Sequence, residues 1–335
     1  MNFILKPSFR MPFIGLEIQF MKHFLQNFTF SAYFSLFIGI TKMKNKEKIL
    51  FILNPISGGK KKELFISLLE SLIVKNNFEI ELVKTEYSGH ATEIAKKAVL
   101  EGLKKIVAVG GDGTVNEIAK VLVNTDTSLG IIPFGSGNGL ARHLKIPMNI
   151  EAALGLISTA SIKKIDVGFI NDQAFFCTAG LGFDAHVGKI FAGLKGRGLL
   201  GYIKSVLKEY FSYVSEEYEV DINGKKNRYR AFLITVANAG QYGNNVYIAP
   251  LADISDGLLD LCIIKNFSVF KLPSMAIRVL NRSINNSNYT KTIQAKKIII
   301  QRKNNGAYHI DGEPLEGGKK FIFEIKEKAL SVLVV

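Results

Sequence analysis

The feature that most constrains this chain is an apolar run that leads into a glycine turn and then into a helical pattern. Residues 106–109 read I-V-A-V, which is typical of a short buried parallel strand. Gly110 and Gly111 follow, and without a Cβ they let the backbone turn and approach a ligand closely. From Thr114 onward, apolar residues recur with the period of a helix. The stretch therefore forms either an ordinary tight turn between strand and helix or an anion site at a helix N-terminus.

Asp112 favours the anion site. A carboxylate beside bound phosphates is repulsive unless a metal ion or a donor hydroxyl compensates its charge. Its presence in this turn is therefore more easily explained by a nucleotide-phosphate site than by a plain connection.

Strand and helix patterns alternate through the first half of the chain. Strands are predicted at 49–53, 78–84, 106–109 and 129–133, and the segments between them carry helical apolar stripes. Loops rich in Gly, Ser and Asn follow three of these strands, at 54–59, 110–113 and 135–139. This order predicts an α/β domain over 43–160 with a doubly wound parallel sheet and with ligands at the carboxyl ends of its strands.

The second half has a different character. Short strands separated by turn signals are predicted at 220–222, 232–236, 259–264, 298–301 and 321–325. One strong helical stripe, 199–214, interrupts them. Residues 161–335 are therefore predicted to form a mainly antiparallel β domain with its own core.

Charge and cysteine content narrow the class of protein. The 335 residues carry a formal net charge of +14, which favours phosphates or an anionic membrane surface as partners. Nucleic acid is not expected, because no zinc spacing, helix-turn-helix or aromatic-rich signature accompanies the charge. Cys177 and Cys262 are far apart and fit buried thiols in a reducing, cytoplasmic compartment.

Residues 1–42 differ from the rest in being rich in Phe and Met. Their uncharged run, 28–40, is shorter than the roughly 20 residues that a membrane span needs. Met43 opens a sequence that resembles a natural start just before the first strand. We interpret residues 1–42 as an N-terminal extension, either from a misassigned start codon or acting as a weak membrane anchor.

Four motifs go beyond generic nucleotide binding: N-P-I-S-G at 54–58, G-G-D-G-T-V-N-E at 110–117, P-F-G-S-G-N at 133–138 and H-I-D-G-E at 309–313. Their order and spacing resemble the diacylglycerol kinase catalytic-domain family, which includes sphingosine kinases and bacterial lipid kinases. The resemblance covers nearly everything from Lys48 onward. It implies a C-terminal β-sandwich and transfer of the γ-phosphoryl group of ATP, with Mg²⁺, to the free hydroxyl of a diacylglycerol-like or sphingoid lipid.

The resemblance also implies roles for individual residues. Glu313 matches the proton acceptor, and Asp112 is expected to be associated with the catalytic metal. The segment 253–258 resembles a magnesium loop with ligands from Asp253, Asp256 and Leu258, although Asp256-Gly257 is equally a hairpin turn. The expected ATP contacts are Asn54, Pro55, Ile56, Ser57, Gly58, Thr85, Gly111, Asp112, Gly113, Thr114, Val115, Asn116, Glu117 and Ser136.

Some features leave alternatives open. Gly139 stands where many bacterial diacylglycerol kinases have Asp, and G-S-G-N followed by Leu140-Ala141 is closer to sphingosine kinases. Asp184 either recognises a lipid head group or caps a helix. An NAD kinase-like enzyme and a catalytically impaired nucleotide-binding regulator remain alternatives, and a homodimer is compatible with the sequence.

Docking on the membrane is expected to be peripheral. Four cations in and before the 199–214 helix are predicted to face the lipid surface; they are Lys195, Arg197, Lys204 and Lys208.

Overall fold

The computed structural model describes residues 47–57, 61–75, 78–192 and 208–335, and all the elements below belong to one unit, Lys48–Val335. The predictions for residues 1–42, for Gly58 and for Lys195, Arg197 and Lys204 lie outside the described residues.

Four parallel strands form one end of the larger sheet, in the order β2-β1-β3-β4. They are β1 (Lys48–Leu53), β2 (Glu79–Lys84), β3 (Lys105–Gly110) and β4 (Ser128–Pro133). All six residues of β4, and five of the six in β1 and in β3, are buried, as expected of strands covered on both faces. The predicted α/β domain with a parallel sheet is confirmed.

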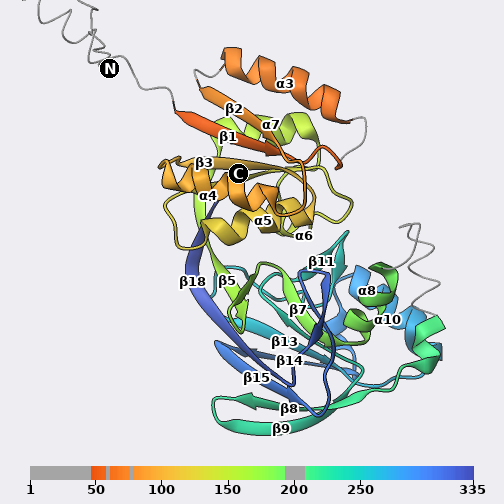
Figure 1. Cartoon of the computed structure of the whole chain (residues 1–335). Coiled ribbons are helices and arrows are strands. Elements are labelled where there is room, and N and C mark those ends of the chain that lie inside the picture. Colours follow the sequence, from red (N-terminus) through yellow and green to blue (C-terminus); the bar gives the residue numbers. More distant parts are fainter. Residues whose placement is uncertain (1–46, 58–60, 76–77, 193–207) are drawn as a thin grey trace, which may run out of the picture. The chain divides into compact units, whose positions relative to one another are not determined.

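Helices cover both faces of these strands (Figure 1). On one face, α4 (His90–Leu100) packs against α5 (Asp112–Leu122). On the other face, α3 (Lys61–Lys75) packs against α7 (Ile150–Thr159). The α5 stripe is buried, as its spacing predicts, but the helix begins at Asp112 and not at Thr114. Asp112 is thus a first-turn residue, where a carboxylate interacts favourably with the helix dipole.

One long strand joins the two halves of the molecule. The strand β18 (Lys320–Val334) pairs antiparallel with β5 (Ser161–Ile170) over most of its length. Its last residues pair in parallel with β4, where Ser331 lies opposite Ser128. The larger sheet therefore continues from the parallel strands into the antiparallel region and contains strands from both sides of residue 160.

A second, six-stranded sheet faces the antiparallel part of the first, and buried side chains from both sheets form a shared core. This confirms the predicted β-sandwich (Figure 1). The second sheet has the order β14-β13-β10-β7-β16-β17. Its strands are β7 (Thr178–Gly182), β10 (Leu233–Ala237), β13 (Leu259–Ile264), β14 (Thr290–Ala295), β16 (Gly306–Ile310) and β17 (Glu313–Gly317).

The remaining elements extend the sheets or connect them. The larger sheet also contains β6 (Gln173–Phe175), β8 (Glu216–Ile222), β9 (Lys225–Ala231) and β15 (Lys297–Arg302). The connecting elements are α6 (Gly139–His143), α8 (Phe183–Ala192), β11 (Gln241–Gly243), β12 (Val246–Tyr247), η1 (Val269–Lys271), α10 (Leu272–Leu280) and η2 (Ile284–Asn286).

Candidate active site

A cavity of about 200 Å³ lies at the carboxyl ends of the parallel strands. The loop after β1 and the start of α5 meet there, because both follow neighbouring strands of the sheet. The Nδ2 of Asn54 donates to the Thr114 Oγ1 at 3.0 Å, and this bond joins the two motifs directly. Seven of the predicted ATP contacts line this cavity: Asn54, Pro55, Ile56, Thr85, Gly113, Thr114 and Glu117.

Other residues shape the walls of this cavity. The Glu117 Oε1 accepts a hydrogen bond from the Gly89 N–H at 3.1 Å, so this carboxylate holds the loop before α4. Tyr87 also lines the cavity, and its ring is stacked on His90 with centroids 4.5 Å apart. Sequence reasoning missed this exposed aromatic surface, which offers a flat face at the rim of the cavity.

Asp112 lies beside this cavity, against the loop 135–139. Its Oδ2 accepts a hydrogen bond from the Asn138 N–H at 2.8 Å, and its Oδ1 accepts one from the Gly139 N–H at 2.7 Å. These amides belong to the start of α6 and stabilise the charge of the Asp112 carboxylate. Its association with the catalytic metal stays a prediction.

The two glycine turns pack backbone against backbone. A Cβ on Gly135 would come within 2.7 Å of the Gly111 Cα, and one on Gly137 would come within 2.7 Å of the Asp112 Oδ2. Glycine is required at both positions by this close approach. The absence of a Cβ therefore brings the two loops together, in addition to any ligand contact.

Four other predicted contacts are placed by the structure as follows. The Val115 side chain is buried in the core, so only its backbone is available to a ligand. Asn116 and Ser57 are half-buried, and Ser136 is exposed at the tip of the 135–139 loop. Whether these residues contact ATP stays a prediction.

The D-G-E turn, 311–313, is connected to the 135–139 loop by Cys177, whose backbone contacts Asp311 and whose thiol lies near Gly139. Both oxygens of the Asp311 carboxylate accept backbone N–H bonds, from Phe176, Cys177 and Thr178, at 2.7 to 3.0 Å. Burial raises the pKa of the Cys177 thiol well above its ordinary value, and the negative charges of Asp311 and Asp112 raise it further. The thiol also lies close to the 135–139 loop, because a Cβ on Gly139 would be 3.4 Å from the Cys177 Sγ.

Glu313 is the first residue of β17, directly after the Asp311-Gly312 turn, and its side chain is exposed. It is therefore free to meet a substrate from solvent. Asp311 is already engaged by three amides; burial raises the pKa of its carboxyl, and these amides offset part of the increase.

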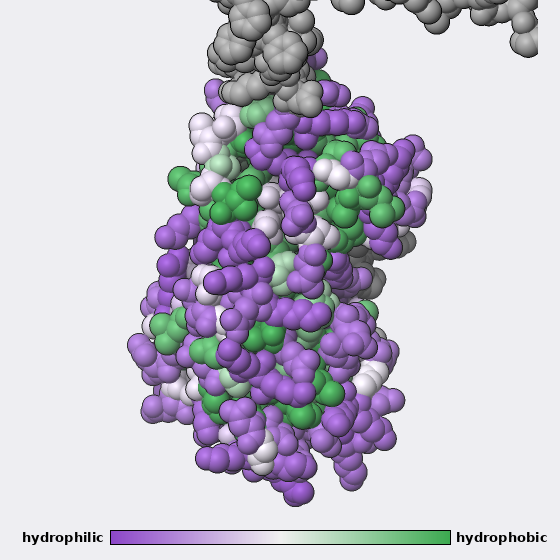
Figure 2. All heavy atoms as spheres, turned by 90° about the vertical axis from the view of Figure 1, so that its left-hand side faces the viewer, coloured by the Kyte–Doolittle hydropathy of each residue, from purple (hydrophilic) through white to green (hydrophobic). Residues whose placement is uncertain are grey.

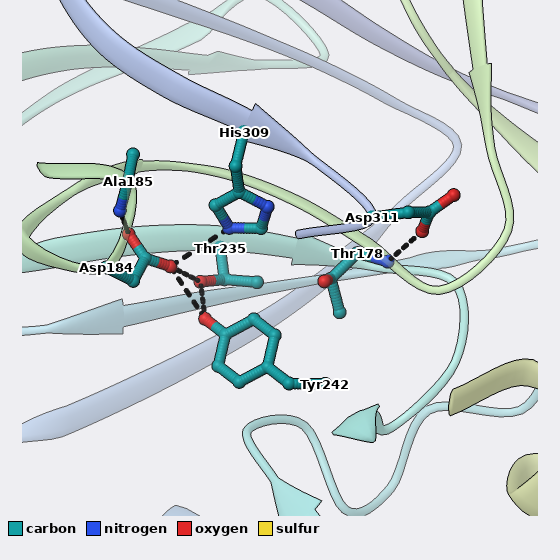
Figure 3. A network of polar contacts seen from close by, with 7 residues as sticks. All are labelled: Thr178, Asp184, Ala185, Thr235, Tyr242, His309 and Asp311. Carbon is teal, nitrogen blue, oxygen red and sulfur yellow. Dashed lines mark hydrogen bonds and ion pairs between the residues drawn. The ribbon is translucent and has the colours of Figure 1, made fainter. Parts of the chain in front are cut away.

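A buried polar cluster lies behind this turn (Figure 3). The Asp184 Oδ2 accepts hydrogen bonds from the His309 Nε2 at 3.1 Å and the Tyr242 hydroxyl at 2.7 Å. Thr235 contributes its hydroxyl, 3.3 Å from the same oxygen and 2.7 Å from the Tyr242 hydroxyl. The cluster connects the α8, β10, β11 and β16 segments, and Figure 3 shows all four side chains converging.

The electrostatics of this cluster follow from burial and pairing. Burial alone would raise the pKa of Asp184, but the ion pair with His309 and the Tyr242 hydroxyl bring it below its ordinary value. Burial, and then the Asp184 charge, raise the pKa of Tyr242 well above its usual range. The Asp184 Oδ1 also accepts the Ala185 N–H at 2.8 Å. Asp184 is thus mainly a member of this cluster. His309 was present in the H-I-D-G-E motif without an assigned role.

The predicted magnesium loop is held in place by a residue that sequence reasoning missed. Asp166 is 1% exposed, and its two oxygens accept the N–H groups of Gly257 and Lys328, both at 2.7 Å. The signal in the sequence was a lone Asp between two apolar residues, in I-D-V at 165–167.

The 253–258 loop could hold Mg²⁺, because the ligands it offers are oxygen atoms, including those of the exposed Asp256 carboxylate. The Asp256 Oδ1 accepts the Leu258 N–H at 2.9 Å, and the Asp253 Oδ1 accepts from Ser255. Within the described part of the chain, no three His, Cys, Asp or Glu residues gather as a metal-binding group. A metal here would therefore need main-chain carbonyls and water as further ligands.

Several large apolar side chains are exposed individually on the described surface. On the face drawn in Figure 2, hydrophilic residues predominate and hydrophobic ones form scattered patches. Lys208 is exposed, and Phe211 and Val214 beyond it are 74% and 71% exposed. Among the described residues, no helix is long and apolar enough to cross a membrane.

Comparison with known proteins assigns this architecture to a family. Residues 48–170 match the diacylglycerol kinase catalytic domain, and residues 177–334 match the YegS C-terminal NAD kinase β-sandwich-like domain. A diacylglycerol kinase of Bacillus subtilis is 30% identical over 272 residues, which cover 78% of this chain and 88% of that protein. The chain belongs to the diacylglycerol kinase family. It is a lipid kinase by that membership.

Other proteins are similar over most of this chain. A YegS-like lipid kinase of Chromohalobacter salexigens is 29% identical over 68% of this chain and 75% of its own length. A crystal structure of a diacylglycerol kinase from Bacillus anthracis has a TM-score of 0.69 at 22% identity, covering 87% of this chain and 98% of that one. At this identity the structural likeness supports the family fold.

Proposed function

We propose that this lipid kinase uses ATP and phosphorylates the hydroxyl of a diacylglycerol-like or sphingoid lipid. The observation that carries the proposal is the cavity at the N-terminus of α5, where Asn54 of the 54–58 motif meets Thr114 and Glu117 of the 110–117 motif, with Thr85 from the end of β2 beside them. Free amides and the dipole at this helix end favour phosphate groups.

The residues of the chain suit phosphoryl transfer, which depends mainly on positioning and charge stabilisation. The Asn54–Thr114 bond fixes the two phosphate-facing turns relative to each other. Asp112 fixes the 135–139 loop beside them through two amides. Mg²⁺, when bound with ATP, would neutralise phosphate charge, and the oxygens of Asp253, Asp256 and Leu258 are the proposed ligands of a further Mg²⁺.

We assign Glu313 as the proton acceptor for the lipid hydroxyl. Its carboxylate is exposed at the turn that also carries Asp311, and it is therefore accessible to a substrate. Association with anionic membranes is part of the proposal and is supported by the net charge of +14 and by exposed Lys208, Phe211 and Val214.

The test is phosphate transfer from labelled ATP to a total lipid extract, with the products identified by mass. A phosphorylated lipid is expected. A labelled product only when NAD replaces the lipids would favour an NAD kinase-like enzyme, and ATP binding without any transfer would favour a regulator.

A Glu313→Gln variant sharpens this test. It should lower turnover by about 10²–10⁴-fold with the KM for ATP unchanged, because the side chain acts on the acceptor. Glu316→Gln in the same strand is the matched control and should retain parental turnover. Parental turnover in Glu313→Gln would remove this residue from the mechanism.

A further inference from the structure

A second cavity, of about 570 Å³, is lined by residues of α6 and β11 and by several basic side chains. Arg142, Lys145, Lys163 and Arg282 line it, whereas Asp253 is the one acidic side chain among its lining residues. The Asp253 carboxylate is itself occupied by the N–H and hydroxyl of Ser255, at 3.0 and 2.7 Å. The cavity therefore carries an excess of positive charge that no role in the kinase reaction explains.

Arg282 is oriented before any ligand arrives. Its guanidinium lies 4.1 Å from the centroid of the Tyr247 ring, and its Nη2 donates to the Tyr247 hydroxyl at 2.6 Å. Stacking on an aromatic face fixes the plane of the guanidinium. A fixed guanidinium fork loses less entropy when it binds the oxygens of a phosphate.

Two of these cations occupy backbone positions that favour glycine. Lys145 has φ +59° after the end of α6, and Arg282 has φ +61° after the end of α10. Among the described residues, ten non-glycine residues have positive φ; seven are Asn or Asp, which tolerate it, and three are basic. Two of those three line this cavity. A basic residue at a position where glycine would be unstrained indicates a use for the side chain.

Neutral polar groups complete the lining. Gln241 is 1% exposed, and its Oε1 has no hydrogen-bond partner among the described residues. Rotation of its amide would present two N–H donors in place of the oxygen. His143 also lines the cavity; burial lowers the pKa of its imidazole, and its Nδ1 accepts the Gly240 N–H at 3.4 Å. The unpaired Oε1 is costly while it is buried, and rotation of the amide to donate to a bound phosphate would offset that cost.

We propose that this cavity is a binding site for a phosphate group, distinct from the nucleotide cavity. The group belongs either to free phosphate or to the head group of an anionic lipid, which share the chemistry recognised here. Arg142 links the site to the kinase machinery, because its Nε donates to the Gly137 carbonyl at 2.9 Å, in the 135–139 loop. An anion held by Arg142 would restrain the loop that Asp112 also holds.

The binding test compares a double variant, Lys145→Gly with Arg282→Gly, with the parent. Glycine relieves both left-handed positions, so the thermal midpoint of the double variant should equal or exceed that of the parent. Lys328→Gly is the matched control, since Lys328 has φ +52° and does not line this cavity. It removes one basic charge at a similar backbone position.

Inorganic phosphate is titrated calorimetrically at constant ionic strength, with and without saturating ADP to occupy the nucleotide cavity. The parent should bind phosphate in both conditions, and the double variant should bind at least about tenfold more weakly, as expected from the loss of two charged hydrogen-bond donors. Lys328→Gly should match the parent. The comparison between variants is read without catalysis, so it stands even if the proposed kinase substrates are wrong.

Vesicles distinguish the source of the phosphate. Co-sedimentation is measured with phosphatidylcholine vesicles with and without phosphatidic acid. Loss of phosphatidic acid-dependent binding in the double variant assigns the site to lipid head groups, whereas unchanged vesicle binding with weakened binding of inorganic phosphate assigns it to free phosphate. Equal binding of both probes by the parent and the double variant, or an equal loss in Lys328→Gly, would overturn the proposal.

Discussion

Replacing Asp112 by Asn tests whether this carboxylate holds the 110–113 turn and the 135–139 loop together. Asp112 accepts amide hydrogens at 2.8 and 2.7 Å, one on each oxygen. An Asn side chain keeps one acceptor oxygen, but its NH₂ group then faces the second amide hydrogen. One charged hydrogen bond is worth about 1.5–3 kcal/mol, and an unpaired donor adds to the cost. We expect the free energy of unfolding to fall by about 2–4 kcal/mol.

The measurement is urea unfolding at pH 7, with the slope of the transition checked for equality with the parent. Asp126→Asn is the control: its side chain is 94% exposed, 3.9 Å from the Lys104 Nζ, and the change should stay within about 0.5 kcal/mol. A value for Asp112→Asn as small as that of the control would refute the structural role. If kinase turnover were nevertheless lost, the carboxylate would act on the ligand and not on the loop.

Other predictions concern buried groups elsewhere. Burial raises the pKa of Asp260 to about 6, so the native state binds its proton more tightly than the unfolded chain, and stability should fall as pH rises from about 4 to 6. Asp260→Asn should remove that slope and raise the free energy of unfolding at pH 7 by about 1–3 kcal/mol in chemical denaturation; a loss of stability would contradict it. A Cβ at Gly180 would lie 2.8 Å from the His309 Nε2 and 2.9 Å from the Ile234 carbonyl oxygen, so Gly180→Ala should cost about 1–3 kcal/mol by thermal unfolding. Gly155→Ala, in a helix with open space around the site, should be neutral or stabilising, and equal effects at both glycines would refute the steric argument.

Local patterns predicted the parallel strands and their helices well, because each is encoded by a continuous apolar run or stripe. They failed for β7, whose sequence T-A-G-L-G has two glycines among five residues and Thr178 as its one β-branched side chain. Its glycines are required by distant neighbours: a Cβ on Gly182 would lie 2.8 Å from the Leu233 Cα. The strand β9 was missed because five of its seven residues are exposed and it carries no apolar stripe.

For the candidate site, sequence motifs identified most cavity residues but not what holds them. The sequence predicted that the negative charge of Asp112 must be stabilised by another group. The amides that donate to it come from a loop 26 and 27 residues further along the chain. The Asp184–His309 pair joins residues 125 apart. Such contacts depend on how the sheets pack, and the spacing of apolar residues along the sequence does not predict them.

The placement of β18 has a consequence for the order in which the molecule can fold during synthesis. Strand β4 acquires its outer neighbour from residues 331 and 332, which leave the ribosome some 200 residues after Ser128. Until then, the edge of β4 exposes unpaired amides and carbonyls on a strand whose six residues are all buried in the finished fold. The α/β half with the parallel strands is therefore synthesised first and completed last. A nascent chain that stalls before β18 would present an aggregation-prone edge to chaperones.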